Sequence, residues 1–182
     1  MVIVPDNGFL FMRHGETEAN ARGIICGSTD LPLNRVGEEQ ADRTAEFLRG
    51  TNIRKIVTSS LLRARQTAAS VTRVTGIEPQ LVSGLEERNW GAWEGQPRSV
   101  LRRDETPPGG ESPGDFRARV IAAFEGLHLN EPTLIVAHSG VAREIHLYLT
   151  DQPHRRMENA ELVLWSRISG QWNCHECFKP GG

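Results

Sequence analysis

Three short apolar runs in this chain of 182 residues are each followed by a cationic or imidazole side chain. Arg13 and His14 follow the run GFLFM, and His138 directly follows TLIVA. Arg63 comes shortly after the third run, KIVT. Guanidinium groups offer paired donors to phosphate oxygens. An imidazole is largely neutral at pH 7 and can attack phosphorus, so this set of residues predicts phosphoryl transfer through a phosphohistidine.

The departure of an alkoxide requires a proton donor, and the irregular segment 84–113 holds carboxyl groups beside aromatic residues. Glu86, Glu87 and Glu94 lie close in sequence to Trp90 and Trp93. Apolar surroundings can keep a carboxyl group protonated at neutral pH. A solvated loop charge explains each of these glutamates as well, so composition alone does not select one donor.

No Asp and Glu cluster of the kind that binds Mg²⁺ accompanies these residues, and the sequence has no Gly-x-x-x-x-Gly-Lys loop. We therefore expect a reaction without metal ion, cofactor or ATP. Cys174 and Cys177 form a Cys-x-x-Cys pair around His175, but a zinc site needs four ligands and the sequence has no second pair. An ordinary terminal strand is expected there, and a role for these three residues stays open.

The elements that must position the site alternate in type. Helices on both faces of a mainly parallel sheet would follow, which is a three-layer α/β/α fold. The carboxyl ends of parallel strands meet at one edge, so His14, Arg63 and His138 are expected to lie close together there. Strands are predicted at 8–12, 55–58, 80–83 and 133–137, helices at 34–49, 61–75, 113–129 and 141–149, and a terminal hairpin at 162–167 and 171–178.

Length and charge limit the classes of protein that fit. A single domain is expected over 1–182, and a net charge of −2 argues against a nucleic-acid binder. No apolar run approaches a membrane span and the N-terminus lacks a basic flank, so a cytoplasmic protein is expected. The expected partner is a small phosphorylated metabolite, and a homodimer through the strands of Trp165 and Trp172 is left open. Of the 21 basic residues 19 are arginine, so composition explains most of them.

The motifs around these residues follow the order of a known family. The stretch 10–33, with MRHGETEAN and GSTDLPL, resembles the opening of the histidine phosphatase superfamily, whose fold is phosphoglycerate mutase-like. The resemblance implies that fold and the family's phosphoryl chemistry. It continues through SSLLRARQTA at 59–68, LEERNWGAWEG at 85–95, GGES at 109–112 and VAHSG at 136–140.

The resemblance also implies roles for the principal residues. His14 matches the nucleophile that becomes phosphorylated, and Glu87 matches the proton donor, whereas position 86 varies in the family. Arg13 and Arg63 match the arginines that clamp the phosphate. His138 matches the second histidine, which holds the phosphoryl oxygens.

Further contacts are implied less directly. Asn20 and Cys26 match phosphate-side positions, although relatives carry Gln or a small hydroxyl residue in place of Cys26. The backbone at Ser139 and Gly140 would donate N–H groups to the phosphate. Segment 95–107 is shorter than in most relatives, which implies a trimmed lid over the pocket. The mutase-like pair Arg88 and Trp90 would contact substrate.

The leading interpretation is a metal-independent phosphatase that hydrolyses phosphate monoesters through phosphohistidine. One alternative is a cofactor-dependent phosphoglycerate mutase, because Arg102 and Arg103 followed by Pro107 and Pro108 resemble its Arg-Arg…Pro-Pro loop. Another is a protein phosphatase for phosphohistidine or phosphoserine, which a trimmed lid permits. A non-catalytic phosphate-binding module would be expected to lack the nucleophile or the acid, and this chain has candidates for both. The sequence does not identify the physiological substrate.

Overall fold

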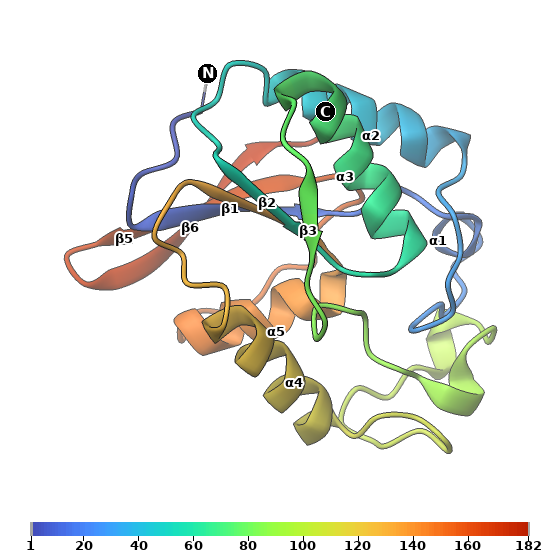
Figure 1. Cartoon of the computed structure of the whole chain (residues 1–182). Helices are drawn as coiled ribbons and strands as arrows, with labels where there is room; N and C mark the ends of the chain where they lie inside the picture. Colours follow the sequence, from blue (N-terminus) through green and yellow to red (C-terminus); the bar gives the residue numbers. More distant parts are fainter. Residues whose placement is uncertain (1, 182) are drawn as a thin grey trace.

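Alternating residues of the first strand, β1 (Gly8–Arg13), divide the core into two layers. Phe9 and Phe11 pack on one face of the sheet, and Leu10 and Met12 pack on the other. Helices α4 (Pro113–Glu125) and α5 (Ser139–Leu149) cover the first face, and α2 (Arg35–Phe47) and α3 (Leu62–Thr75) cover the second. The computed structural model thus has the expected α/β/α layers (Figure 1).

The structure describes residues 2–181, so the two terminal residues of the expected domain lie outside it. The six strands form one sheet in the order β3-β2-β4-β1-β5-β6. The first four are parallel, and the last two form the predicted antiparallel hairpin. The remaining elements are α1 (Glu18–Ala21), β2 (Lys55–Thr58), β3 (Pro79–Leu81), the 3₁₀ helices η1 (Gly91–Trp93) and η2 (Arg98–Val100), β4 (Thr133–Ala137), β5 (Leu162–Ile168) and β6 (Gln171–Phe178).

The register of the central strands brings three strand ends together. Arg13 at the end of β1 pairs with Ala137 at the end of β4, and Thr58 at the end of β2 pairs with Val136. The backbone N–H groups of His14 and Ser59 continue these ladders by donating to carbonyls of β4. The prediction that the three apolar strands end at one edge is therefore confirmed.

The helix that follows β4 starts two residues earlier than expected. It begins at Ser139, with His138 as its N-cap, rather than at residue 141. At the other end of the sheet, α4 stops at Glu125 instead of near residue 129, because the chain turns at Gly126 and reaches a positive φ of 45° at His128. Its start matches the prediction, since Ser112 Oγ accepts the Asp115 N–H.

Two further differences concern short elements. Helix α1 was not predicted, because four residues are too few to show helical periodicity. Thr17 caps it, and Asn20 completes a capping box. The strand expected at 80–83 is β3, one residue earlier and shorter.

The terminal hairpin completes one side of the core. Trp165 of β5 is buried, and its ring stacks on Phe9 with centroids 6.0 Å apart. Trp172 of β6 meets the same Phe9 ring edge-on at 5.7 Å. Both tryptophans therefore pack on the core. None of the helices within residues 2–181 combines the length and apolar character needed to cross a membrane.

Candidate active site

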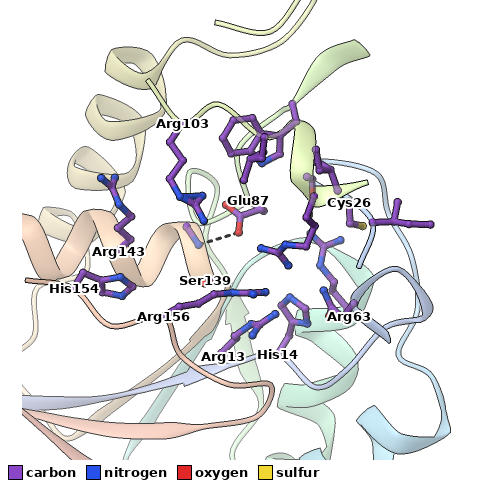
Figure 2. Close-up of a pocket in the computed structure, with 18 residues that line it drawn as sticks. Arg13, His14, Cys26, Arg63, Glu87, Arg103, Ser139, Arg143, His154 and Arg156 are labelled. Atoms are coloured by element: carbon purple, nitrogen blue, oxygen red, sulfur yellow. Dashed lines mark hydrogen bonds between the residues drawn. The ribbon is translucent and has the colours of Figure 1, made fainter. Parts of the chain in front are cut away.

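A cavity of about 220 Å³ opens at the edge where β1, β2 and β4 end (Figure 2). Six arginines and one carboxylate contribute to its wall. It therefore forms a strongly cationic pocket in a chain whose net charge is −2. The lining residues are Arg13, His14, Asn20, Ile24, Ile25, Cys26, Gly27, Arg63, Glu87, Trp90, Arg98, Leu101, Arg103, Ser139, Gly140, Arg143, His154 and Arg156.

The imidazole of His14 has one nitrogen engaged and one available. Nδ1 lies 2.6 Å from the carbonyl oxygen of Gly15. A carbonyl only accepts, so Nδ1 carries the proton and Nε2 keeps its lone pair. Burial and the positive charges of Arg63 and Arg13 lower the pKa of His14 well below its ordinary value. The ring is therefore neutral at pH 7, the form in which a nitrogen can act as nucleophile.

The backbone after His14 is held by a close contact with α2. A Cβ on Gly15 would lie 2.3 Å from the Gly37 carbonyl oxygen, and a Cβ on Gly37 would lie 2.0 Å from the Glu16 carbonyl oxygen. Both positions therefore require glycine for the two segments to touch. The Gly15 N–H also donates to Thr67 Oγ1 of α3 at 3.0 Å. These contacts fix the orientation of the neighbouring His14.

His138 lies behind the cavity wall, next to His14. The two ring centroids are 5.1 Å apart. Nε2 of His138 hydrogen-bonds Ser59 Oγ at 2.7 Å, and the whole residue is buried. Burial and the charge of Arg63 lower its pKa well below the ordinary value, so this ring is also neutral.

Arg13 and Arg63 flank the two imidazoles. Arg13 Nη1 donates to the Met157 carbonyl at 2.7 Å, and Arg63 donates to the carbonyls of Gly27 and Thr29 at 2.6 and 2.9 Å. These bonds fix both guanidinium groups. Burial, together with the charges of Arg156 and Arg98, lowers the pKa of Arg13 to about 9, so it stays cationic at pH 7.

Two buried side-chain nitrogens within residues 2–181 have no hydrogen-bond partner, and both belong to this group. They are Arg13 Nε and His138 Nδ1. Buried polar atoms are paired in most protein interiors. Arg13 Nε is therefore a free donor for an anion at the site, and His138 Nδ1 is one in the tautomer in which Nε2 accepts from the Ser59 hydroxyl.

Glu87 faces the His14 imidazole across the cavity (Figure 2). Its Oε2 accepts the N–H of Gly140 at 2.9 Å, and its Oε1 accepts the N–H of Arg88 at 2.9 Å. Glu86, the other glutamate of the pair, is engaged elsewhere by Ser60 Oγ and the Gly84 N–H, both at 2.7 Å. Of these two adjacent glutamates, Glu87 is the one that lines the cavity.

The other predicted phosphate contacts also line the cavity. Asn20 Oδ1 accepts hydrogen bonds from Thr17 and Asn159, which leaves its amide donors for the cavity. The Cys26 thiol donates to the Thr29 carbonyl at 3.3 Å, and burial raises its pKa, so it is a neutral thiol. Ser139 and Gly140 form the first turn of α5.

The expectation for the Gly140 backbone is corrected in part. Its N–H was expected to donate to phosphate, but it donates to Glu87. The Gly140 N–H therefore orients the carboxylate of Glu87, the proton-donor candidate, in this structure.

Arg88 has a different position from the one expected of a substrate contact. Its side chain is buried and does not line the cavity within the described residues. Its three nitrogens donate to the carbonyls of Arg103, Glu105 and Glu111 at 2.7, 2.7 and 3.0 Å. The guanidinium therefore ties the segment 103–111 to the site, while Trp90, 4.1 Å beneath it, does line the cavity.

Four cationic or imidazole residues of the cavity were missed by sequence reasoning. They come from the lid segment, from α5 and from the segment between α5 and β5. Because arginine is so common in this chain, no residue-type signal separates these arginines from the rest. They are Arg98, Arg143, His154 and Arg156. Arg103 also lines the cavity, and the sequence indicated it only through the mutase-like Arg-Arg…Pro-Pro loop.

The arrangement suits a phosphoryl group bound between imidazole and carboxyl groups. Guanidinium groups and a neutral imidazole would bind its oxygens, His14 Nε2 would face phosphorus, and Glu87 would lie at the leaving-group side. Among residues 2–181, no three His, Cys, Asp or Glu side chains are grouped so that they could hold a metal ion. Cys174, His175 and Cys177 lie on the terminal strand β6.

Comparison with known proteins places this geometry in a family. The model of the histidine phosphatase superfamily (branch 1) matches residues 9–177. The chain is 34% identical to an uncharacterized phosphatase of Bacillus subtilis over 77% of its length and 74% of that protein. It is 33% identical to a broad-specificity phosphatase of Saccharomyces cerevisiae over 79% of this chain and 70% of that protein.

A solved structure shares the fold. A phosphoglycerate mutase from Thermus thermophilus superposes with a TM-score of 0.78 at 31% identity, covering 94% of this chain and 99% of that one. Phosphatases and mutases are therefore both found among the relatives of this chain. With the site geometry and the family match taken together, the chain belongs to branch 1 of the histidine phosphatase superfamily.

Proposed function

We propose that this protein is a metal-independent phosphatase that hydrolyses small phosphate monoesters through a phosphohistidine on His14. The observation that carries the proposal is the neutral His14 imidazole, 5.1 Å from the buried ring of His138, with the Glu87 carboxylate across the same cationic cavity. Binding a phosphate would need only cations and N–H groups. A nitrogen nucleophile with a free lone pair opposite a carboxyl group supports catalysis in addition.

In the first step, His14 Nε2 attacks phosphorus and the phosphorus–oxygen ester bond breaks. The Glu87 carboxyl group gives its proton to the leaving alkoxide, which departs as an alcohol. Gly15 keeps Nδ1 protonated, so the phosphorylated ring is cationic and a good leaving group for the next step.

In the second step, the Glu87 carboxylate removes a proton from water as the water oxygen attacks phosphorus. The phosphorus–nitrogen bond then breaks, which releases inorganic phosphate and returns His14 to its neutral form. Arg13, Arg63 and His138 would hold the phosphoryl oxygens through both displacements. Asn20, Cys26 and the first turn of α5 would complete the phosphate site.

Rapid acid-free quenching of turnover with ³²P-labelled substrate tests this chemistry. The wild-type protein should acquire acid-labile, alkali-stable label, and p-nitrophenyl phosphate should be hydrolysed with a chelator present. The His14→Ala variant should lose both turnover and label. A His14→Ala protein that still becomes labelled would refute His14 as the nucleophile, and loss of activity with chelator would refute metal independence.

A mutase is the second candidate, because the arginines of the lid could retain a bisphosphorylated intermediate. Incubating 3-phosphoglycerate with a catalytic amount of 2,3-bisphosphoglycerate separates the two. A phosphatase releases inorganic phosphate, whereas a mutase forms 2-phosphoglycerate.

A further inference from the structure

Ser59 directly follows strand β2 and contacts His138, which directly follows the neighbouring strand β4. The backbone N–H of Ser59 donates to the Val136 carbonyl at 3.1 Å, so the ladder between the two strands fixes its position. The His138 carbonyl accepts the Ala142 N–H at 2.9 Å in the first turn of α5. The two side chains are buried and therefore meet from two anchored stretches of backbone.

The contact between them joins the Ser59 hydroxyl to Nε2 of His138, with the two atoms 2.7 Å apart. The ring is neutral, because burial and the charge of Arg63 lower the pKa of His138 well below its ordinary value. A neutral imidazole has one N–H donor and one bare nitrogen, and its hydrogen bonds determine which nitrogen carries the proton. The proton of His138 is therefore either on Nε2 or on Nδ1.

The neighbours of the hydroxyl group indicate which of the two groups donates. Ser59 Oγ also accepts the N–H of Leu61 at 3.3 Å, and within residues 2–181 the one acceptor that meets its hydrogen is Nε2 of His138. If the hydroxyl donates to Nε2, the ring proton lies on Nδ1 and only that nitrogen is unpaired. If Nε2 donates instead, the hydroxyl hydrogen and the bare Nδ1 are both buried without a partner. The first arrangement is favoured, because each unpaired buried group is costly.

Nδ1 of His138 is thereby left as a free donor beside the nucleophile candidate. It is one of the two buried side-chain nitrogens without a partner within residues 2–181, and the ring centroid of His14 lies 5.1 Å from that of His138. Buried polar atoms are normally paired, so an unpaired one at a functional site is available to a ligand. An N–H group is complementary to an oxyanion, whereas the lone pair of a bare nitrogen repels it.

The next residue, Ser60, has the same side chain in different surroundings. Its hydroxyl is exposed and donates to Glu86 at 2.7 Å. Neither serine lines the cavity within the described residues, so an effect of Ser59 on the chemistry must pass through His138. The two adjacent serines therefore form a natural pair of test and control positions.

Ser59 also contributes to the start of α3. The N–H that its Oγ accepts belongs to Leu61, the N-cap residue of that helix, and α3 carries Arg63. At 3.3 Å this bond is longer than the 2.7 Å contact with the imidazole. A residue that only supported the helix start would leave the ring proton of His138 where it is. The position of that proton therefore distinguishes the two roles.

We infer that Ser59 is a positioning residue of the phosphoryl-transfer site: its hydroxyl donates to Nε2 of His138 and thereby keeps the ring proton on Nδ1, the nitrogen left to bind a phosphoryl oxygen. The inference rests on the proposed function, in which His138 holds an oxygen of the transferring group. As negative charge increases on that oxygen, the Nδ1–H stabilises it without any rearrangement of the ring. A ring with its proton on Nε2 would present a lone pair to the oxygen instead.

NMR spectroscopy of the unliganded protein measures the position of the proton directly. A long-range ¹H–¹⁵N correlation spectrum distinguishes a protonated ring nitrogen from a bare one by its ¹⁵N shift, and the signals that disappear in His138→Gln belong to this ring. At pH 7 the wild type should show a protonated Nδ1 and a bare Nε2 on His138. A proton on Nε2, or shifts averaged between the two tautomers, would overturn the inference.

Two serine variants connect the proton to the chemistry. Ser59→Ala removes the hydrogen bond that fixes the tautomer, so a proton on Nε2 of His138 should become detectable. Its kcat/KM for p-nitrophenyl phosphate should fall by at least about tenfold. Ser60→Ala is the matched control and should keep the wild-type tautomer and a kcat/KM within about twofold of the wild type. A Ser59→Ala protein that keeps the proton on Nδ1, or one that loses it at unchanged kcat/KM, would contradict the inference.

A binding measurement separates this inference from the proposed function. Orthovanadate mimics the transferring phosphoryl group and needs no turnover, and by titration calorimetry its Kd should be at least about tenfold higher for Ser59→Ala than for the wild type or Ser60→Ala. If the wild type hydrolyses p-nitrophenyl phosphate but Ser59→Ala matches it in tautomer, rate and vanadate affinity, the inference fails and the phosphatase proposal stands. If no phosphate ester is hydrolysed, yet Ser59→Ala shifts the tautomer and weakens vanadate binding, the proposed function fails and the role of Ser59 in oxyanion binding stands.

Discussion

The carboxylate of Glu87 accepts a hydrogen bond from the backbone N–H of Gly140, with Oε2 2.9 Å from the nitrogen. Gly140 lies in the first turn of α5, directly after His138 and Ser139. The candidate proton donor is therefore oriented by the same helix start that positions the second imidazole. A change in this turn should affect protonation of the leaving group without removing any of the side chains assigned to the chemistry.

Gly140→Ala should displace Glu87, because a Cβ at residue 140 would lie 2.1 Å from Glu87 Oε1. The flexible end of a side chain can move, so we expect a folded protein whose kcat/KM for alkyl phosphates falls by about tenfold or more. Gly114→Ala, in the first turn of α4, is the control, since its Cβ would meet only Ser112 Oγ at 3.9 Å. Equal activity of the two variants would show that Glu87 does not depend on this turn.

Glu87→Gln should make the rate depend more steeply on the basicity of the leaving group. An amide cannot donate a proton to an alkoxide, so kcat/KM for an alkyl phosphate should fall by about 10²-fold or more. p-Nitrophenolate leaves without being protonated, so the decrease in kcat/KM for p-nitrophenyl phosphate should be much smaller. Steady-state kinetics across a series of leaving groups measures the slope. Equal losses for alkyl and aryl phosphates would argue against Glu87 as the acid.

Arg88→Met should loosen the segment 103–111, because three backbone carbonyls lose a buried donor. Methionine keeps apolar contact with Trp90, so we expect a folded protein that is about 2–4 kcal/mol less stable. Hydrogen exchange at amides of this segment should become at least about tenfold faster. Arg117→Met, at a half-exposed arginine that pairs with Glu144, is the comparison. Unchanged exchange in Arg88→Met would mean that Arg88 does not hold the segment.

The stability of the fold should fall as the pH drops below the ordinary histidine pKa of 6.5. His14 and His138 both have folded-state pKa values well below that value, so the unfolded chain binds protons there that the folded chain does not. The contribution of these two histidines to the free energy of unfolding is complete above pH 6.5. Below that pH it decreases by up to about 1.4 kcal/mol per pH unit for each histidine.

Urea unfolding between pH 7 and pH 5 measures this dependence. The double variant His14→Gln and His138→Asn should show a shallower decrease than the wild type, whatever its absolute stability. Parallel curves would mean that neither imidazole remains neutral in the folded protein at these pH values.

Local sequence was enough to predict the centre of the site. The apolar runs that became β1, β2 and β4 are fully or almost fully buried strands, and their sequence alternates with helical segments. Parallel strands in one sheet must end at a common edge, so residues that directly follow them are brought together. His14 and His138 were predictable for that reason, and the family motifs indicated Glu87 across the cavity.

Only the tertiary structure determined which arginine side chains form the outer wall of the cavity. Arg98 begins the three-residue helix η2, and Arg103 and Arg156 lie outside any helix or strand, so no repeating pattern predicts where their side chains point. The Arg-Arg…Pro-Pro resemblance indicated Arg103 but not its place in the cavity wall. Long-range contacts determine the paths of these segments, among them the donors of Arg88 and the bond from Arg13 to the Met157 carbonyl. Such contacts join residues far apart in the chain, and the same contacts made Arg88, expected at the substrate, a support for the lid.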